Sequence, residues 1–119
     1  MAWEIDFHPE FETEFTTLSE SVQDELLALG QTLSALGPTM GRPRVDTLNG
    51  SKYANMKELR FDADDGVWRV AFAFDPKRRG ILLVAGDKSG VSSRIFYRRL
   101  ITTADRRYDD HLAELKKGG

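Results

Sequence analysis

The chain opens with an alternation of apolar and polar residues and then changes to a helical period. In residues 3–7 (WEIDF) apolar side chains alternate with acids, which predicts a half-buried strand that ends at Pro9, because proline cannot donate to a strand ladder. From Phe11 the apolar residues recur every three or four positions as far as Leu36. This spacing predicts two helices with a break near residues 18–20, where a serine can cap the second helix.

The rest of the chain predicts a long loop, three strands and a last helix. Residues 37–55 have no sustained period and contain glycine, proline and an Asn-Gly turn signal. Strand-like runs at residues 56–62, 67–75 and 80–86 are separated by short turns, which predicts an antiparallel meander whose third, almost wholly apolar run is central. A helical period returns over residues 92–115. The predicted order is β-α-α-β-β-β-α, an α+β sandwich with a mainly antiparallel sheet and helices packed on it.

Length and composition indicate one soluble domain that covers residues 1–119. A chain of 119 residues with 40% hydrophobic and 30% charged residues has the composition of a folded domain, and no apolar run approaches the roughly 18–20 residues of a membrane span. The chain shows no signal-peptide pattern, so we expect a cytoplasmic protein. With no cysteine and with two histidines far apart, His8 and His111, the sequence predicts no metal site and no cofactor.

Basic residues are absent from the first third of the chain. Residues 1–38 contain eight acids and no lysine or arginine, whereas residues 39–119 contain all 17 bases against 11 acids. The net charge of −2 therefore combines an acidic segment with a basic one, and we expect two differently charged faces. A locally basic surface attracts polyanions through phosphate neutralisation and counterion release, so we expect nucleic-acid chemistry in the downstream segment.

The basic residues of the meander occur at positions that a purely structural role explains poorly. Arg69 lies in the middle of the second predicted strand, where a guanidinium needs either a carboxylate partner or an open groove. A cross-strand pair with Glu58 or Asp62 on a solvated face is the structural alternative. A concave sheet lined with lysine and arginine would instead suit RNA, because fixed cations stabilise the charge that a phosphorane transition state gains. Such a mechanism needs no metal.

The combination of motifs in this chain resembles a known family. The run NMKELRFDADDGVWRVAFAFDPKRRGILLVAGDKSG, with the HPEF start, the GRPRVDTLNGS loop and the Tyr-Arg-Arg helix, closely resembles the RelE/ParE superfamily of bacterial toxins, in particular its HigB-like branch. The resemblance covers essentially the whole chain. It implies a toxin encoded with a neutralising antitoxin and, in the RelE and HigB branches, cleavage of mRNA in the ribosomal A site. It also implies an active site of lysine and arginine on the sheet, with a tyrosine or histidine near the last helix.

Carried over by position, the resemblance implies five catalytic residues. Lys57 would accept the proton of the ribose 2′-OH. Arg60 and Arg69 would hold the scissile phosphate, while Lys88 or Tyr97 would assist the leaving 5′-oxygen or stack on a base. The product would be a 2′,3′-cyclic phosphate. Contacts with RNA and the ribosome are expected from other basic residues, which are Arg42, Arg44, Lys52, Arg78, Arg79, Arg94, Arg98 and Arg99.

Two departures from the family pattern keep other functions open. The total charge is acidic, and the segment from Lys88 to Tyr97 lacks the histidine that some relatives use. We interpret His111 as a surface or core residue and His8 as a residue that positions the turn after the first strand. The leading hypothesis is a metal-independent, ribosome-dependent mRNA endoribonuclease, held inactive by an antitoxin segment that covers the basic groove. The alternatives are a non-enzymatic ParE-like inhibitor of DNA gyrase and a degenerate phage-derived relative that only binds its partner.

Overall fold

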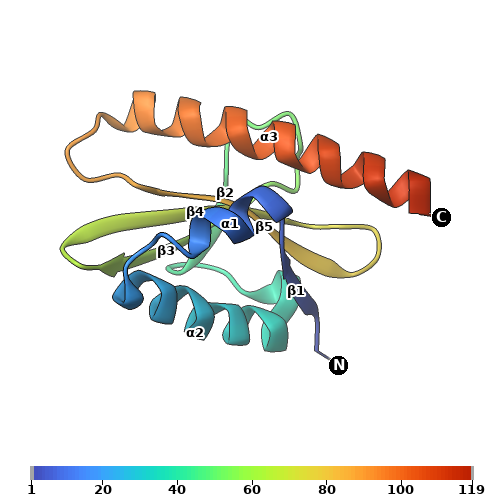
Figure 1. Cartoon of the computed structure of the whole chain (residues 1–119), viewed down its shortest axis with the longest axis horizontal. Coiled ribbons are helices and arrows are strands. Elements are labelled where there is room, and N and C mark those ends of the chain that lie inside the picture. Colours follow the sequence, from blue (N-terminus) through green and yellow to red (C-terminus); the bar gives the residue numbers. More distant parts are fainter. Residues whose placement is uncertain (1, 119) are drawn as a thin grey trace.

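One five-stranded sheet forms the middle layer of the molecule, and helices lie on both of its faces (Figure 1). The structure is a computed structural model and describes residues 2–118. Among these residues no helix is both long enough and apolar enough to cross a membrane. In chain order the elements are β1 (Glu4–Phe7), α1 (Pro9–Phe15), α2 (Glu20–Leu36), the 3₁₀ helix η1 (Gly37–Thr39), β2 (Val45–Thr47), β3 (Lys57–Ala63), β4 (Gly66–Phe74), β5 (Arg79–Asp87) and α3 (Ser93–Gly118).

The strand order in the sheet is β1-β5-β4-β3-β2, and the predicted antiparallel meander forms its middle. β1 pairs in parallel with β5, and β2 pairs antiparallel with β3. The predicted α+β class is confirmed. β5 is an interior strand, in keeping with its apolar sequence, but the middle strand is β4, which corrects the prediction of a central third run. The predicted long loop contains β2, which at three residues is too short to show an alternation in the sequence.

Each face of the sheet has its own hydrophobic core, because successive strand residues point to opposite faces. Leu59 and Phe72 pack on one face with Leu33 of α2. Ala71 packs on the other face with Leu100 of α3. The strand side chains that can reach a site beside α3 are therefore those on the same face as Ala71.

Helix α2 begins and ends at residues whose chemistry favours those positions. Ser19 caps it at the predicted break, where its hydroxyl accepts a hydrogen bond from the N–H of Val22 at 3.3 Å. Gly37 ends it with a φ of 59°, and its N–H donates to the carbonyl of Leu33. A Cβ at Gly37 would overlap the indole of Trp3. Both the left-handed backbone and the close approach of the indole therefore require glycine at this position.

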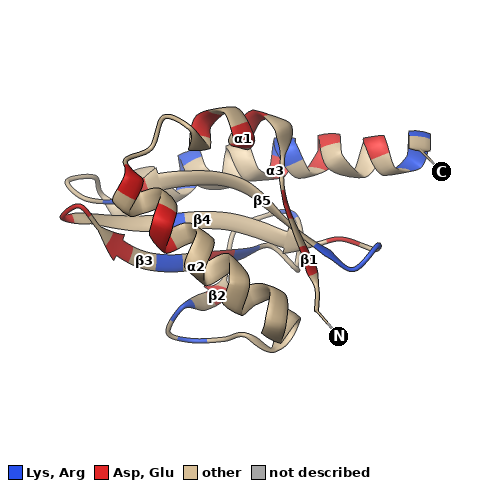
Figure 2. Cartoon of the chain, turned by 60° about the horizontal axis from the view of Figure 1, so that its bottom comes forward, with Lys and Arg blue, Asp and Glu red and all other residues tan. Residues whose placement is uncertain are grey.

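The acidic start of the chain lies against the basic helix α3, so the two kinds of charge are not confined to separate faces (Figure 2). Arg106 pairs with Glu10 of α1 at 3.1 Å, and Arg107 pairs with Glu14 at 2.6 Å. Arg107 is buried and also donates to the carbonyl of Leu83 at 2.8 Å. Part of the charge asymmetry in the sequence is thus neutralised within the fold, which corrects the expectation of two differently charged faces.

Candidate active site

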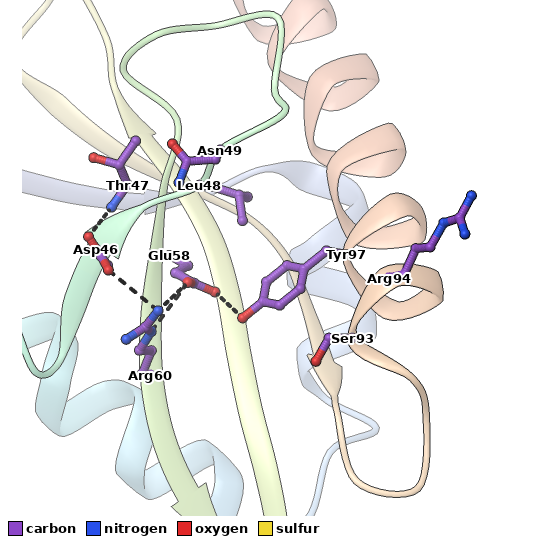
Figure 3. Close-up of a pocket in the computed structure, with 9 residues that line it drawn as sticks. All are labelled: Asp46, Thr47, Leu48, Asn49, Glu58, Arg60, Ser93, Arg94 and Tyr97. Carbon is purple, nitrogen blue, oxygen red and sulfur yellow. Dashed lines mark hydrogen bonds and ion pairs between the residues drawn. The ribbon is translucent and has the colours of Figure 1, made fainter.

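A cavity of about 380 Å³ opens between the β2–β3 edge of the sheet and the first turns of α3 (Figure 3). Strand pairing explains which charged groups gather there. Arg60 of β3 lies directly opposite Arg69 of β4. Glu58 lies opposite Ala71, so these side chains share the face that α3 covers. The lining residues are Asp46, Thr47, Leu48, Asn49, Glu58, Arg60, Ser93, Arg94 and Tyr97.

The Glu58 carboxylate is the centre of this site, although only 2% of the residue is exposed. Arg60 donates to its Oε2 through Nη2 at 3.0 Å and through Nε at 3.2 Å. The Tyr97 hydroxyl donates to Oε1 at 2.9 Å and accepts a hydrogen bond from Nε of Arg69 at 3.3 Å. The same Nε of Arg69 lies 3.9 Å from Oε1. A buried carboxylate, a phenol and two guanidinium groups therefore meet at one point, where opposite charges compensate each other.

The pKa shifts at the site follow from these contacts. Burial is the main cause that raises the pKa of Tyr97; the Glu58 carboxylate also raises it, while the hydrogen bond from Arg69 opposes the shift. Tyr97 is therefore a neutral phenol at pH 7 and can donate a proton. At the rim, the hydrogen bond from the Thr47 N–H, aided by nearby guanidinium groups, lowers the pKa of Asp46. Asp46 thus adds a fixed negative charge beside the cavity.

Four of the five residues predicted as catalytic lie together. The two arginines and Tyr97 make the contacts described above, and Nζ of Lys88 lies 5.7 Å from the centroid of the Tyr97 ring. Lys57 does not lie with them. It pairs across the ladder with Phe72, which belongs to the core under α2, so Lys57 is on the opposite face of the sheet. Lys57 and Arg60 were expected in one site, but the structure separates them. Side chains alternate between the two faces of a strand, so residues three positions apart point to opposite faces.

Some of the residues predicted to bind RNA or the ribosome lie around the cavity. Arg94 lines it, and Arg98 and Arg99 are exposed on the following turn of α3. Arg42 and Arg44 are exposed in the segment before β2. Arg42 pairs with the lining residue Asp46 at 3.0 Å, so Arg42 and Arg94 lie where a polyanion entering the cavity would approach. Arg99 instead lines a second cavity, beside Gly86 and Leu100.

The other members of that predicted set have partners elsewhere in the fold. Lys52 pairs with Asp109 of α3 at 2.7 Å. The hairpin between β4 and β5 carries Arg78, which stacks 4.2 Å from the centroid of the Trp3 ring. The next residue, Arg79, pairs with Asp75 at 3.3 Å and with Asp6 at 3.6 Å. The structure does not bring these three residues to the cavity.

The sequence pattern does not single out Glu58 as a site residue. It indicates Glu58 only as a possible ion-pair partner of Arg69, and that contact exists at 3.9 Å. The available signal was the Glu-Leu-Arg spacing, which places Glu58 and Arg60 on one face of a strand. The sequence pattern could not show that Tyr97 from α3 would close over the carboxylate, because that contact joins residues 39 positions apart.

Neither histidine reaches the candidate active site. His8 caps α1, and its Nδ1 accepts a hydrogen bond from the N–H of Glu10 at 3.1 Å, which confirms its interpretation as a turn residue. Nε2 of His111 lies 2.7 Å from Oδ2 of the buried Asp75. His111 therefore joins the second half of α3 to the turn between β4 and β5.

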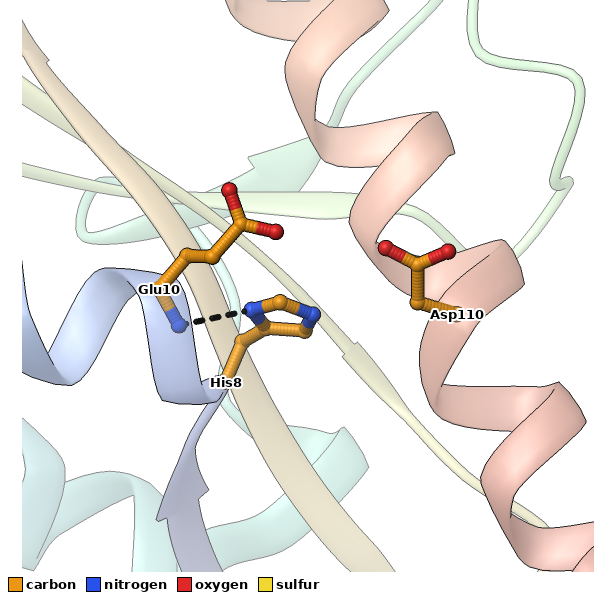
Figure 4. A group of neighbouring side chains, drawn as sticks. All are labelled: His8, Glu10 and Asp110. Carbon is orange, nitrogen blue, oxygen red and sulfur yellow. Dashed lines mark hydrogen bonds between the residues drawn. The ribbon is translucent and has the colours of Figure 1, made fainter.

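His8, Glu10 and Asp110 bring oxygen and nitrogen atoms within 4.8 Å of one another, a spacing that could suit a metal ion (Figure 4). Because Nδ1 of His8 accepts a backbone N–H, the proton of the neutral ring is assigned to Nε2, which then has no lone pair for a metal. Arg106 also pairs with both carboxylates, at 3.1 Å with Glu10 and at 3.4 Å with Asp110. The group does not fit a metal ion, because a guanidinium already supplies the positive charge.

Comparisons with known proteins agree on one family. The profile of the family described as "Phage derived protein Gp49-like (DUF891)" matches residues 13–109. The toxin candidate HigB3 of Mycobacterium tuberculosis is 41% identical over 111 residues, which are 93% of this chain and 95% of the relative. The toxin candidate HigB2 of the same organism is 38% identical over 100 residues, which are 83% of this chain and 49% of the relative.

A solved structure supports the fold. A double mutant of the Escherichia coli toxin RelE, in the free state, superimposes with a TM-score of 0.57 and covers 90% of this chain and 98% of its own. The two sequences are 15% identical, so the likeness concerns the fold.

Proposed function

The chain belongs to the Gp49-like family and is a HigB-like toxin of the RelE/ParE superfamily, and from this premise we propose that it inhibits translation as a ribosome-dependent mRNA endoribonuclease. It would be the toxin of a toxin–antitoxin pair, as the names of its relatives suggest. The observation that carries the proposal is the cluster in the cavity, where the Glu58 carboxylate contacts Arg60 and Tyr97 and lies 3.9 Å from Arg69. Cleavage by an internal ribose hydroxyl needs these groups: a base, a proton donor and cations for the phosphate.

In the proposed reaction the Glu58 carboxylate accepts the proton of a ribose 2′-OH. The 2′-oxygen forms a bond to the adjacent phosphorus, and the bond from phosphorus to the 5′-oxygen breaks. Tyr97 donates its phenolic proton to that leaving oxygen, because its raised pKa keeps the proton on the phenol at neutral pH. The products are a 2′,3′-cyclic phosphate and a 5′-hydroxyl. The proton gained by Glu58 returns to Tyr97 through their hydrogen bond or through solvent, which restores the site.

The two arginines can bind the phosphate without losing their present contacts. Arg60 donates to Glu58 through Nε and Nη2, and Arg69 donates to Tyr97 through Nε and to the Trp68 carbonyl through Nη1. A guanidinium has five N–H donors, so each arginine keeps others for phosphate oxygens. Because these cations are already held in place, they stabilise the charge that develops on the phosphorane without reorganisation.

Glu58 takes over the role of proton acceptor that the resemblance assigned to Lys57. Lys57 lies on the opposite face of the sheet, where it cannot reach a phosphate held by Arg60. Lys88, 5.7 Å from the Tyr97 ring, is placed to add positive charge near the leaving oxygen. The exposed arginines beside the cavity, Arg94 among them, would contact RNA phosphates of the message or the ribosome.

The test is primer extension on mRNA from cells that express the wild-type chain, Glu58→Gln or the control Lys57→Ala. Wild-type and Lys57→Ala chains should produce cuts within translated frames. Glu58→Gln keeps the shape of the side chain but removes the base, so cutting should fall by about 10²- to 10⁴-fold. Circular dichroism of the purified variants checks that they are folded.

Other outcomes would contradict the proposal in distinct ways. Growth arrest with intact message would indicate another target, such as DNA gyrase. No growth arrest by the wild-type chain would favour a relative that only binds its partner. If cutting is retained in Glu58→Gln but lost in Lys57→Ala, the proton acceptor is Lys57 and not Glu58. That result would refute the mechanism.

A further inference from the structure

The second cavity, which Arg99 lines, has a volume of about 230 Å³ and lies on the other flank of α3 from the candidate active site. We call it the edge slot. Phe96 and Leu100 of α3 line it on one side, and the end of β5 lines it on the other. Gly86 of β5 leaves room for the Phe96 ring, because a Cβ there would come within 2.9 Å of it. The slot is smaller than the pockets of about 300–1,000 Å³ that take drug-sized ligands, so it suits a single ring system.

The end of β5 also presents an open strand edge at the slot. β1 pairs with β5 only as far as Leu82, and beyond that residue the outer side of β5 has no strand partner among the described residues. On the inner side, the N–H of Lys88 donates to the carbonyl of Val67 at 2.7 Å. Main-chain groups alternate in direction along a strand, so those of Ala85 and Asp87 point away from β4. The slot therefore offers main-chain donors and acceptors beside its apolar wall.

The α3 side of the slot carries a hydroxyl group that the fold does not use. Thr103 lines the slot, and its hydroxyl has no hydrogen-bond partner within the part of the chain that the structure describes. The adjacent Thr102 differs, because its hydroxyl donates to the carbonyl of Arg98 at 2.8 Å. The Thr103 hydroxyl is thus free to bond to a ligand.

The charges at the slot favour a ligand with a negative group. Arg99 lines the slot, is exposed and forms no ion pair within residues 2–118. Asp87 also lines it, but its Oδ1 already accepts two main-chain N–H groups, at 3.0 and 2.9 Å. Further along α3, two acids of α1 are paired with Arg106 and Arg107. The unpaired positive charge at the slot is therefore that of Arg99.

We propose that the edge slot binds a nucleobase of the RNA that flanks the nucleotide being cut, an inference that rests on the function proposed above. A nucleotide combines a flat ring with a polar edge and a negative phosphate, and the slot has a matching group for each. The ring would lie against Phe96 and Leu100, and its edge would bond to Thr103 and to the outward main chain of Ala85. The phosphate of the same nucleotide would contact Arg99.

The first turns of α3 connect the slot to the candidate active site. Tyr97 contacts Glu58 on one flank of the helix, while the adjacent Phe96 lines the slot on the other. The two aromatic rings meet edge to face, with centroids 5.1 Å apart. An RNA strand whose scissile phosphate lies at Arg69 would cross these turns, where Arg94 is exposed, before a flanking base reaches the slot. A base held there would fix the register of the strand and so the position of the cut.

The experiment is an NMR titration of the full chain carrying Glu58→Gln, which disables the proposed chemistry. The probes are the four 5′-nucleoside monophosphates and ribose 5-phosphate, which lacks a base. At least one nucleotide should shift the amide signals of residues 84–87, and ribose 5-phosphate should not.

Two pairs of matched variants locate the binding. Thr103→Val removes the hydroxyl but keeps the shape of the side chain, and Arg99→Gln removes the charge. Each should weaken nucleotide binding by about threefold or more, because each removes one contact. Thr102→Val and Arg106→Gln make the same substitutions on α3 outside the slot, so binding should stay within about twofold of the parent. Melting temperatures of all four variants check that the helix is intact.

Three results would overturn the proposal. The slot does not recognise a base if no nucleotide shifts the signals of residues 84–87, or if ribose 5-phosphate shifts them equally. Equal weakening in Thr103→Val and Thr102→Val would show that the substitutions act through the helix. If nucleotides leave these amides unchanged but purified antitoxin protects them from hydrogen exchange, the strand edge docks a protein instead.

The titration also separates this inference from the proposed nuclease activity. Cleavage of mRNA in cells, without nucleotide binding at the slot, would refute the slot alone. Nucleotide binding at the slot, with mRNA left intact in cells, would refute the nuclease and leave the slot as a nucleotide site.

Discussion

Two adjacent arginines on α3, Arg106 and Arg107, should differ sharply in what their removal does to stability. Both pair with acids of α1, but the Arg106 side chain is 54% exposed and that of Arg107 is 6% exposed. An exposed ion pair gains little, because water solvates both partners well when the pair is broken. Arg107 makes two hydrogen bonds to Glu14, at 2.8 and 2.6 Å, and one to the carbonyl of Leu83 at 2.8 Å.

The size of the Arg107 effect follows from what Arg107→Met would leave behind. The Leu83 carbonyl would lose the guanidinium hydrogen bond, and an unsatisfied buried acceptor costs about 1–3 kcal/mol. Glu14 is 47% exposed and can return to water, so the full penalty of an isolated buried charge does not apply. Nε of Arg107 is already buried without a partner among the described residues, and its removal offsets part of the loss. We expect a loss of about 2–3 kcal/mol in the free energy of unfolding.

Urea denaturation followed by tryptophan fluorescence measures this difference directly. The transition midpoint should fall clearly for Arg107→Met, with a melting temperature about 6–15 °C below that of the wild type, while Arg106→Met should stay near the wild type. The slope of the transition should be unchanged in both variants if the same surface unfolds. Equal losses in the two variants, or a larger loss for Arg106→Met, would refute the argument that burial and the carbonyl contact decide the energy.

Three further predictions concern other parts of the fold. Gly37→Ala should destabilise the chain by about 2 kcal/mol or more in urea melts, because its φ of 59° is left-handed and its Cβ would overlap the Trp3 indole; a neutral result would contradict the helix-end geometry. Burial by itself raises the pKa of Asp75, but the hydrogen bonds it accepts lower the pKa overall, so its stabilisation is present above the unfolded pKa and is lost as the pH falls through the folded value. Asp75→Asn should therefore flatten the decline in unfolding free energy below about pH 4, and an unchanged acid limb would exclude this role. The hydrogen bond to Asp109 raises the pKa of Tyr53 to about 12, so the late phase of an alkaline absorbance titration should shift to lower pH in Asp109→Asn, as Tyr53 moves toward its ordinary value; the same curve in both chains would refute the contact.

The sequence predicted the elements that depend on local pattern. The helical period and the serine at the break located α2, and the strand-like runs between short turns located the meander within one residue of the observed bounds. These predictions succeeded because hydrophobic periodicity and helix capping depend on residues that are close together in the sequence. The short strand β2 was missed, because three residues do not establish an alternation. The parallel pairing of β1 with β5 was also not predicted, because period says nothing about which distant strand is the partner.

In the candidate active site, too, the individual residues could be predicted from the sequence, but the contacts between residues far apart in the chain could not. The resemblance supplied Arg60, Arg69 and Tyr97, and the structure joins them through the Glu58 carboxylate. It also supplied Lys57, which lies on the other face of the sheet. In a strand, moving by one position changes the face to which a side chain points. A resemblance that is matched by position alone therefore could not show that Glu58, and not its neighbour Lys57, faces the candidate active site.

The ion pairs that β1 and α1 make with β5 and α3 also set an order of events while the chain is being made. Asp6, Glu10 and Glu14 leave the ribosome early, but their partners Arg79, Arg106 and Arg107 are synthesised only after most of the sheet. β1 likewise cannot join the sheet until β5 has been synthesised, because β5 is its only strand partner among the described residues. The growing chain therefore begins as a negatively charged segment that resists collapse and association, and its contacts between α1 and α3 can form only when α3 has emerged. Tyr97 belongs to that last element, so the cluster of Glu58, Arg60, Arg69 and Tyr97 is completed only at the end of synthesis.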